Sequence, residues 1–525
     1  MKKILIIGAG PAGLTAALEL ARENEKAAGP LYDVTVVEAS DTFGGISRTV
    51  VHGGSRMDIG GHRFFSKDPQ VMAWWKELMP LQGEPSFDDR KLGREKPLEA
   101  GGPAPDEEDR VMLVRRRVSR IYYLKKFFDY PVSMKWQTFK IMGFFRTVAA
   151  GVSYVWSAVF KKKETSLENF YINRFGRVLY GMFFEKYTEK LWGRHPREIS
   201  ADWGAQRVKG LSIMAVVRDM FRKIFGVKDK GKVETSLIEQ YWYPKLGPGQ
   251  LWETAAAEAE ARGVKFLREH EVVKLTGRDG RLTGAVCRTP EGEKSFEADL
   301  ILSTMPVKDL VADLDGPAVP EDVAAAAAGL PYRDFVTVGL LADRLNLKNE
   351  TDIPTLGDIV PDCWIYVQEP DVKLGRIQIV NNWSPYMTPD PEHSVWIGLE
   401  YFCREGDEFW SMDEKACADF AVSELVSMGI LKEGSVRDFH RERVKKAYPA
   451  YFDTYSEMDK ITAYLDSFDN LYCLGRNGQH RYNNMDHSMV TAFRAVDHIT
   501  GRISDKSEIW KVNTEKEYHE ESKEN

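Results

Sequence analysis

A glycine-rich turn between two β-rich segments constrains the fold more than any other feature of this sequence. The apolar run Lys3 to Ile7 leads into Gly8-Ala-Gly10-Pro-Ala-Gly13, which opens a helical pattern that runs to Ala21. A second β-rich run, Tyr32 to Val37, then ends at Glu38. This order predicts a strand–helix–strand unit of a parallel sheet that binds a dinucleotide.

Each position of this unit has a chemical reason. Gly8 permits the tight turn after the strand, Gly10 lets the backbone approach a pyrophosphate, and Gly13 lets helix and strand pack closely. The free N–H groups at the helix N-terminus face the phosphates. Glu38 is placed to accept hydrogen bonds from a ribose.

The composition is that of a folded globular protein. A length of 525 residues predicts two or three packed lobes. The net charge of -7 predicts no nucleic-acid partner, so local Arg and Lys must hold any anionic ligand. The five cysteines have no zinc-ligand spacing, and we expect no metal. Because the chain shows no secretion signal, we expect a cytoplasmic location.

Two segments between residues 85 and 163 allow more than one interpretation. Residues 85–108 are rich in Pro, Gly and charge, which predicts a surface excursion or a disordered insertion. Residues 147–160 (TVAAGVSYVWSAVF) are too short to form a transmembrane segment. We interpret them as a core helix. The alternative is a helix on a membrane surface, supported by the basic run Lys161 to Lys163.

The remaining chain alternates between helical and β patterns. Phe139 to Met220 is mostly helical, with a capping box at Thr165-Ser-Leu-Glu168. A second group of elements is expected to rejoin the nucleotide-binding lobe: a helix at Trp252–Ala261, a strand at Val264–Leu267, a hairpin around Asp279-Gly280 and a strand at Ala298–Ser303. A mixed sheet is expected from four alternating segments: Phe335–Leu341, Trp364–Val367, Arg376–Val380 and Ser394–Tyr401.

Residues after Glu38 indicate which dinucleotide binds. Gly44-Gly45 and Arg48 resemble the glycine-rich motif that amine-oxidase-like FAD proteins place after their ribose-binding acid. Near the C-terminus, Leu471 to Met489 has a short strand, then Gly475-Arg476, then a helix start that directs its amides at a flavin ring. Both segments favour FAD over NAD.

Further motifs in separated blocks resemble the UDP-galactopyranose mutases, and the eukaryotic-type members more than the bacterial ones. Asp58-Ile-Gly-Gly61-His62 is similar to a flavin-facing D-x-G-G-H loop. Five other blocks match: Tyr187–Gly193 (YTEKLWG), Ser200–Val208 (SADWGAQRV), Tyr243–Gly249 (YPKLGPG), Trp364–Tyr366 with Arg376, and Tyr448-Pro449 with Tyr482 and Asn484–Ser488. The chain departs from the eukaryotic pattern in three places: at Val132-Ser133, at Gly375, and between Tyr482 and Asn484, where the helix start is shorter.

The resemblance implies a set of site residues. The implied catalytic residues are His62, Arg207, Arg376 and Asn484. The implied substrate-binding residues are Tyr130, Trp192, Tyr366, Tyr448 and Tyr482. The implied cofactor-binding residues include those of the dinucleotide unit. They are Gly8, Gly10, Gly13, Glu38, Gly45, Arg48, Gly61, Gly475 and Arg476. Guanidinium groups suit phosphate oxygens because they present several charged donors in one plane.

The resemblance also implies a fold and a reaction. The expected fold is α/β, with a discontinuous Rossmann-like FAD-binding domain in three parts (1–70, 231–305 and 446–510), a mostly helical substrate lobe (71–230), a mixed α/β substrate domain (306–445) and a frayed tail (511–525). The expected enzyme is an FAD-dependent isomerase. Its reduced flavin N5 attacks the anomeric carbon of a nucleotide sugar and interconverts pyranose and furanose forms.

Two rival functions remain open on the sequence. An oxidoreductase with the same fold would take hydride from an amine, a porphyrinogen-like compound or a lipid-linked sugar, and would need an apolar pocket without clustered arginines. A non-catalytic flavin-binding protein would not need so many separated site-like blocks. Because there is no second dinucleotide motif, NAD(P)H or another reductant would bind the mutase only transiently.

Overall fold

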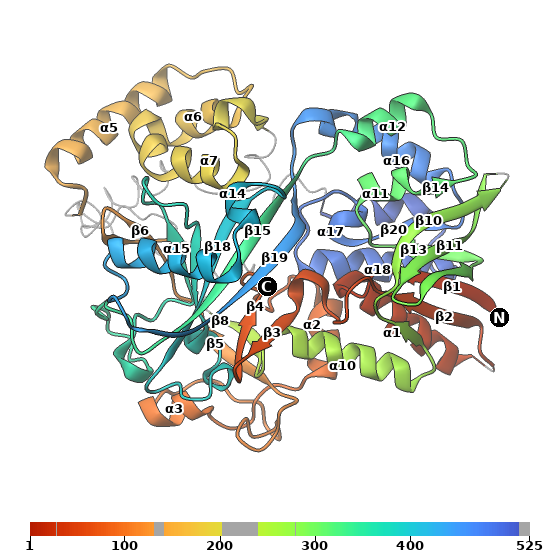
Figure 1. Ribbon diagram of the computed structural model, residues 1–525, viewed down its shortest axis with the longest axis horizontal. Coiled ribbons are helices and arrows are strands. Elements are labelled where there is room, and N and C mark those ends of the chain that lie inside the picture. Colours follow the sequence, from red (N-terminus) through yellow and green to blue (C-terminus); the bar gives the residue numbers. More distant parts are fainter. Residues whose placement is uncertain (28, 131–140, 202–239, 279, 514–525) are drawn as a thin grey trace, which may run out of the picture.

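The computed structural model describes residues 1–513 except 28, 131–140, 202–239 and 279. Figure 1 shows a parallel sheet with its helices on one side of the molecule and a large, mostly antiparallel sheet on the other. A group of helices lies above this second sheet in the same view. The fold is α/β, as the sequence predicts, and the cofactor sheet is assembled from distant parts of the chain.

The parallel sheet has five strands in the order β20-β13-β1-β2-β9. Their bounds are Leu471–Cys473, Leu300–Ser303, Lys2–Ile7, Tyr32–Val37 and Lys265–Leu267. β-rich runs in the sequence predict the strand at Tyr32–Val37 and the strands in the three later segments. All four pairings are parallel, so the strands end at one common edge.

Helices and a second sheet cover this parallel sheet. The helices α1 (Pro11–Lys26), α10 (Pro248–Ala261) and α18 (Met485–Ile499) share one apolar core with it. A four-stranded sheet, β12-β11-β10-β14, contributes to the core on the other side. Its strands span Gly292–Glu297, Arg281–Thr289, Glu271–Arg278 and Leu314–Asp315. Helices α11 (Val307–Ala312), α12 (Glu321–Ala328) and α16 (Met458–Asp466) complete that core.

The second large sheet has seven strands in the order β19-β15-β18-β17-β16-β6-β7. Their bounds are Val436–Pro449, Tyr332–Ala342, Val395–Cys403, Arg376–Ile379, Trp364–Val367, Ser119–Tyr123 and Lys126–Asp129. Only β16 and β6 pair in parallel within this sheet. This is the mixed sheet that the alternating segments predict. Helix α15 (Glu414–Ser427) packs against β15 and β19.

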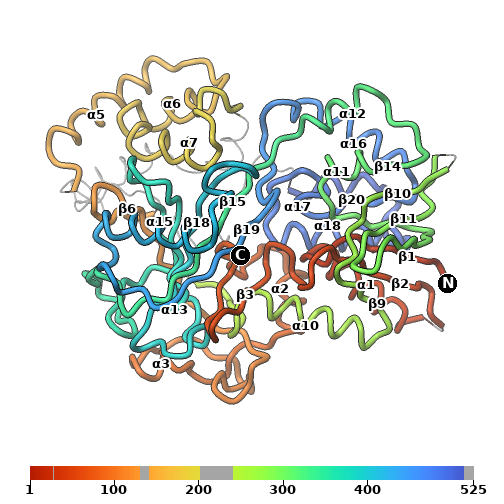
Figure 2. Tube along the Cα trace, in the orientation of Figure 1, coloured from red at the N-terminus to blue at the C-terminus, as the bar shows by residue number. Residues whose placement is uncertain are grey.

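Short elements connect the two large sheets. The hairpin of β3 (Thr49–His52) and β4 (Ser55–Asp58) follows the dinucleotide unit. A second pair, β5 (Met112–Arg116) and β8 (Gln240–Pro244), brings residues before and after the helical lobe together. Figure 2 follows the chain through these crossings.

The helical lobe contains α5 (Phe144–Val159), α6 (Leu167–Tyr180), a π-helical turn (Gly181–Glu185) and α7 (Lys186–Trp192). The N-cap of α6 is Ser166, whose hydroxyl accepts a hydrogen bond from the Asn169 amide, so the predicted cap at Thr165 is one residue too early. The chain is also not one continuous helix, because Gly176 has a left-handed φ of 76°. The helical prediction for residues 202–220 lies outside the described residues.

Helix α5 contradicts our prediction of a core helix for residues 147–160. Ala150 and Ser157 are buried, but most of its large apolar side chains are exposed to solvent. The helical periodicity was read correctly, but periodicity does not tell which side of a helix faces inward. No helix in the described parts of the chain is long and apolar enough to cross a bilayer.

The segment 85–108 is an ordered surface excursion, so the alternative of a disordered insertion is wrong. It begins with helix α3 (Phe87–Leu92), whose Ser86 and Asp89 form a reciprocal capping box. The Asp88 carboxylate is buried and pairs with Arg115 of β5 at 2.9 Å. Burial raises the pKa of Asp88, but Arg115, Ser86 and Arg94 together hold it well below its ordinary value, so the carboxyl stays ionised and fixes the segment to β5.

Candidate functional site

A cavity of about 860 Å³ lies where the parallel sheet meets the seven-stranded sheet. The carboxyl ends of the parallel strands supply Gly8, Glu38, Thr304 and Gly475 to its lining. In open α/β sheets, ligands bind outside the carboxyl ends of the strands. The other wall comes from the seven-stranded sheet and includes Phe335, Trp364, Tyr366, Arg376 and Tyr448.

The dinucleotide end has the geometry that its glycines predict. Gly8 has a left-handed φ of 93°, and Gly10 lines the cavity at the start of α1. A Cβ on Gly13 would lie 1.9 Å from the Gly8 carbonyl oxygen, so only glycine permits this approach of helix to strand. One carboxylate oxygen of Glu38 accepts from the Ala9 amide at 2.7 Å, and the other accepts from Ser40.

The glycine pair after Glu38 lies at the same end, but its arginine does not. Gly45 lines the cavity, and its α-carbon lies close to that of Gly10. Arg48 is absent from the lining and pairs with Glu442 of β19 at 3.2 Å. Arg48 thus joins the dinucleotide unit to the seven-stranded sheet, and a cofactor contact for it stays a prediction.

The D-x-G-G-H loop is fixed at its first residue. Asp58 is buried, and its carboxyl group accepts hydrogen bonds from the hydroxyls of Tyr243 and Thr49. Burial raises the pKa of Asp58 to about 7, although both hydroxyl contacts oppose that shift. The Thr49 hydroxyl also accepts from the Gly249 amide at 3.0 Å. Two of the family-like blocks are therefore bonded to each other.

The same loop places Gly61 and His62 on the cavity wall. A Cβ on Gly61 would lie 2.2 Å from the Trp364 ring, so the ring covers this glycine. The Nδ1 atom of His62 is buried without a hydrogen-bond partner among the described residues. Burial, with a smaller contribution from Arg476, lowers the pKa of His62 to about 3. The ring is neutral at physiological pH and keeps a nitrogen for a bound ligand.

Arg376 is the centre of a polar cluster on the seven-stranded sheet. Its Nε donates to the Tyr187 hydroxyl at 2.8 Å, and its NH1 contacts Glu400 at 3.1 Å and Tyr448 at 3.2 Å. The guanidinium lies 5.3 Å from the Trp364 ring centre. Glu400 is fully buried, and burial raises its pKa while Arg376 opposes the rise. The cluster fixes the direction in which Arg376 presents its charge.

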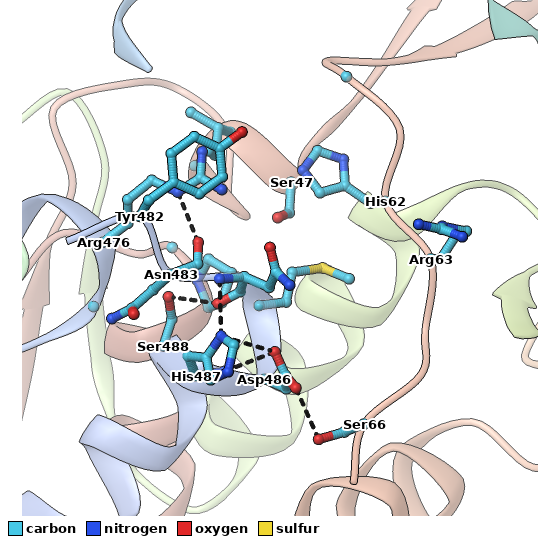
Figure 3. Close-up of a pocket in the computed structure, with 18 of the residues that line it drawn as sticks. Ser47, His62, Arg63, Ser66, Arg476, Tyr482, Asn483, Asp486, His487 and Ser488 are labelled. Atoms are coloured by element: carbon cyan, nitrogen blue, oxygen red, sulfur yellow. Dashed lines mark hydrogen bonds and ion pairs between the residues drawn. The ribbon is translucent and has the colours of Figure 1, made fainter. Parts of the chain in front are cut away.

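Arg476, Tyr482 and Asn484 also line the cavity. Figure 3 shows Tyr482 and Arg476 on one side and His62 on the other. Arg476 donates to the Asn483 carbonyl at 2.8 Å and to the Ala447 carbonyl at 3.0 Å. Asn484 lines the cavity and caps the N-terminus of α18. The positive end of that helix therefore faces the cavity.

Aromatic residues form another part of the wall. The rings of Tyr130 and Tyr366 lie 4.5 Å apart, and the Tyr482 ring is stacked on Tyr448 at 5.5 Å. All four rings line the cavity. Trp192 does not line it and is buried in the core of the helical lobe, where it packs edge-on against Phe452. Arg207 lies outside the described residues.

Several residues that the structure brings to the site could not be selected from the sequence. Arg63 and Arg117 line the cavity, but a single arginine in a sequence carries no signal of its own. Glu400 is buried under Arg376 and comes from the neighbouring strand. Tyr187 falls in one of the matched blocks, and its hydroxyl contact to Arg376 distinguishes it from Trp192.

These features fit a bound flavin dinucleotide. The Gly8–Gly13 turn and Glu38 can hold the pyrophosphate and ribose at the edge of the parallel sheet. The buried Nδ1 of His62 and the glycine surface beneath Trp364 face the same cavity. The Trp364 ring occupies the space that a side chain at Gly61 would fill, so this glycine lets the indole pack against the loop backbone at the cavity wall.

Comparisons with known proteins agree with this geometry. Residues 11–499 match the model of the flavin containing amine oxidoreductase family. A crystal structure of reduced UDP-galactopyranose mutase is similar over 99% of this chain and 100% of that one, with 20% identity and a TM-score of 0.74. A putative protoporphyrinogen oxidase from Exiguobacterium is 14% identical over 94% of this chain and 98% of that one, with a TM-score of 0.63.

A third solved structure has yet another activity in its name. The CLA-producing fatty acid isomerase from P. acnes is 14% identical over 95% of this chain and 98% of that one, with a TM-score of 0.54. At such identities these structures share the fold with this chain. The match of the family model spans nearly all of the sequence, and the chain belongs to the flavin-containing amine oxidoreductases.

Proposed function

We propose that the protein is an FAD-dependent nucleotide-sugar mutase, most simply one that interconverts UDP-galactopyranose and UDP-galactofuranose. The observation that carries this proposal is the cationic and phenolic cluster around Arg376 in the same cavity as the dinucleotide turn. A diphosphate needs such donors, because its oxygens are anionic and accept several hydrogen bonds.

The charge of the cavity wall supports an anionic substrate. Among the residues that the structure describes, seven Arg or Lys side chains line the cavity, against four Asp or Glu side chains. One of the four acids is Glu38, which we assign to the cofactor ribose. The rival oxidoreductase would need an apolar pocket without clustered arginines, whereas this wall combines aromatic rings with arginines.

We assign roles to the chain's residues in three groups. Arg376 and the hydroxyls of Tyr448 and Tyr482 stabilise the diphosphate as it leaves the sugar. The paired rings of Tyr130 and Tyr366 stack on the base of the nucleotide. The neutral His62 offers an uncharged hydrogen-bonding atom beside the flavin.

The reaction needs a reduced flavin, whose N5 supplies a nucleophile for the anomeric carbon. The protein's residues hold the sugar nucleotide in line with that atom and exclude water from the reacting carbon. Arg207 and Asn484 complete the proposed catalytic set. In this proposal the parallel sheet, from the ranges 1–70, 231–305 and 446–510, carries FAD, and the remaining domains carry the substrate.

The test is to reduce the purified protein with dithionite, add UDP-galactose, and follow the products by chromatography. The proposal expects isomerised sugar nucleotide in the reduced state, none in the oxidised state, and no net oxidation of flavin. A second arm replaces dithionite by NADPH and asks whether a nicotinamide donor supports turnover. Peroxide release with another substrate, without any isomerised sugar, would establish the oxidoreductase instead.

A further inference from the structure

Helix α5 presents an unusual surface. Eight large apolar side chains of the helix and the residue after it are exposed: Phe144, Phe145, Val148, Val152, Val155, Trp156, Val159 and Phe160. Phe145 is 86% exposed and Trp156 is 65% exposed. The spacing of three to four residues places them on one continuous stripe of the helix. Exposed apolar surface of this extent marks an interaction site.

The opposite face of α5 is small and polar, and it faces the protein. The Ser153 hydroxyl accepts a hydrogen bond from the Val178 amide of α6 at 3.2 Å. A Cβ on Gly176 of α6 would lie 2.8 Å from the Tyr154 backbone nitrogen, so the two backbones touch at this glycine. These contacts fix the rotation of α5 about its axis. The apolar stripe is therefore held outward by the fold.

The charges beside the stripe have one sign. Residues 141–163 contain Arg146 and Lys161 to Lys163 but no Asp or Glu. The first acid, Glu164, is paired with Arg174 at 2.6 Å. The whole chain has a net charge of -7, so this segment is a cationic site on an anionic protein. The partner that fits it must be both apolar and anionic.

We propose that α5 binds an anionic lipid bilayer, lying in the plane of its interface. The apolar stripe enters the boundary between headgroups and acyl chains, and the lysines meet the lipid phosphates. The 16 residues of α5 form a helix about 24 Å long. A helix that lies in the plane of the interface does not need to be long enough to cross the bilayer. Trp156 suits the interface because the amphipathic indole ring favours headgroup depth, and Phe160 adds to the apolar face that enters the bilayer.

A second copy of the chain fits this surface less well. Two α5 helices packed face to face would bring Arg146 and the three lysines of one copy close to those of the other. Like charges at short distance oppose such a contact. An anionic membrane provides the complementary charge. The helical lobe carries α5 at the outer edge of the molecule, with α6 on its inner side, which leaves room for a flat partner (Figure 1).

Vesicle flotation tests the proposal with the full-length flavin-loaded protein. We expect binding to vesicles of phosphatidylglycerol and phosphatidylcholine, weak binding to phosphatidylcholine alone, and loss of binding as salt is raised. Replacing Lys161, Lys162 and Lys163 by Gln lowers the affinity roughly 100-fold. The double variant Val152→Asp/Val155→Asp abolishes binding. Leu31→Asp, a matched change at an exposed apolar residue elsewhere, leaves binding unchanged, and flavin absorbance reports that each variant is folded.

A fluorophore at α5 gives a second, local measurement. The five native cysteines are buried, so a Val155→Cys variant can be labelled selectively with a polarity-sensitive dye. The proposal expects a blue shift of the dye on addition of anionic vesicles and no shift for the same dye at Leu31→Cys. Failure of the wild-type protein to float with anionic vesicles would overturn the proposal. A stripe covered by a second copy, detected by sedimentation without vesicle binding, would overturn it as well.

Discussion

Arg376 and Glu400 form an ion pair of 3.1 Å beneath the candidate site, and the glutamate is fully buried. Removal of one partner of a buried pair leaves an uncompensated charge and costs about 3 to 5 kcal/mol. Arg376 therefore has a structural role in addition to its proposed role in binding the diphosphate. The two roles can be separated by experiment.

The Arg376→Ala variant is expected to keep its yellow flavin spectrum and to bind UDP about 100-fold more weakly. It is also expected to unfold more easily, because Glu400 loses its partner. The double variant Arg376→Gln/Glu400→Gln should regain stability but not UDP affinity. Calorimetric titration with UDP and thermal unfolding measure the two effects.

One control variant and two contrary outcomes complete this test. Arg437→Ala removes an exposed arginine of the same sheet that pairs with Asp343, and it should change neither property. Loss of flavin from Arg376→Ala would show that the arginine serves the cofactor. Recovery of UDP binding in the double variant would contradict the proposed diphosphate contact.

The buried carboxyl group of Asp58 predicts a pH dependence of stability. Its pKa is raised to about 7 in the folded protein, above the ordinary value of 3.8, because burial disfavours the charged form. The folded state then holds a proton that the unfolded state releases. The resulting stabilisation is complete below pH 4 and is lost as pH rises towards 7, by up to about 4 kcal/mol.

Denaturant unfolding between pH 5 and pH 8 measures this effect as the difference between wild type and Asp58→Asn. Wild type should lose stability relative to the variant as pH rises, because asparagine does not titrate. Asp419→Asn, at an exposed residue of α15, should run parallel to wild type. Parallel curves for Asp58→Asn would show that Asp58 is ionised throughout.

The contact of Gly61 with Trp364 predicts a steric effect on cofactor binding. The Cβ of a Gly61→Ala variant would lie 2.2 Å from the indole ring, so the loop must move. We expect the free energy of unfolding to fall by about 1 to 3 kcal/mol and the flavin content after purification to be lower. A second substitution in the same chain, Trp364→Leu, should restore part of the stability and part of the flavin content.

Gly29→Ala is the control for this substitution, because nothing lies within 4 Å of the added carbon. Flavin content is read from the ratio of absorbance at the flavin band to that at 280 nm. Normal flavin content and stability in Gly61→Ala would mean that the loop adjusts without cost. In that case the close packing of the ring on the glycine would have no role in holding the cofactor.

Trp192 and Tyr448 give opposite predictions for substrate binding. Trp192→Phe should lower the midpoint of thermal unfolding by a few degrees and leave KM for the sugar nucleotide unchanged, because the indole lies in the core of the helical lobe. Tyr448→Phe should raise KM, since it removes a hydroxyl bonded to Arg376. Steady-state kinetics of the reduced enzyme test both. A raised KM in Trp192→Phe would return this residue to the substrate site.

Much of the parallel sheet could be predicted because its signals are local. The strand Tyr32–Val37 has the predicted bounds, and Gly13 packs against Gly8 as expected. Such features depend on residues that are close in the sequence and on the spacing of apolar residues. Both can be read from a single sequence. The resemblance to a family added the order of the site blocks.

Contacts between residues far apart in the sequence could not be predicted. Arg48 follows the glycine pair Gly44-Gly45, but its partner Glu442 enters from β19. Glu400 gives no sign in the sequence of its pairing with Arg376, since the register of β17 and β18 creates it. For α5, the prediction of a core helix was wrong because the apolar stripe faces outward and the small face with Ala150 and Ser157 is the buried one.

The order of strands in the parallel sheet also has a consequence for biosynthesis. The turn that opens the cofactor site is made first, but the sheet ends with β20 (Leu471–Cys473), which pairs with β13. Four of the five strands are made by Ser303, and only the edge strand β20 waits for almost the whole chain. Gly475 and Arg476, which follow β20, line the cavity, so the cavity wall is complete only after this last strand has been made.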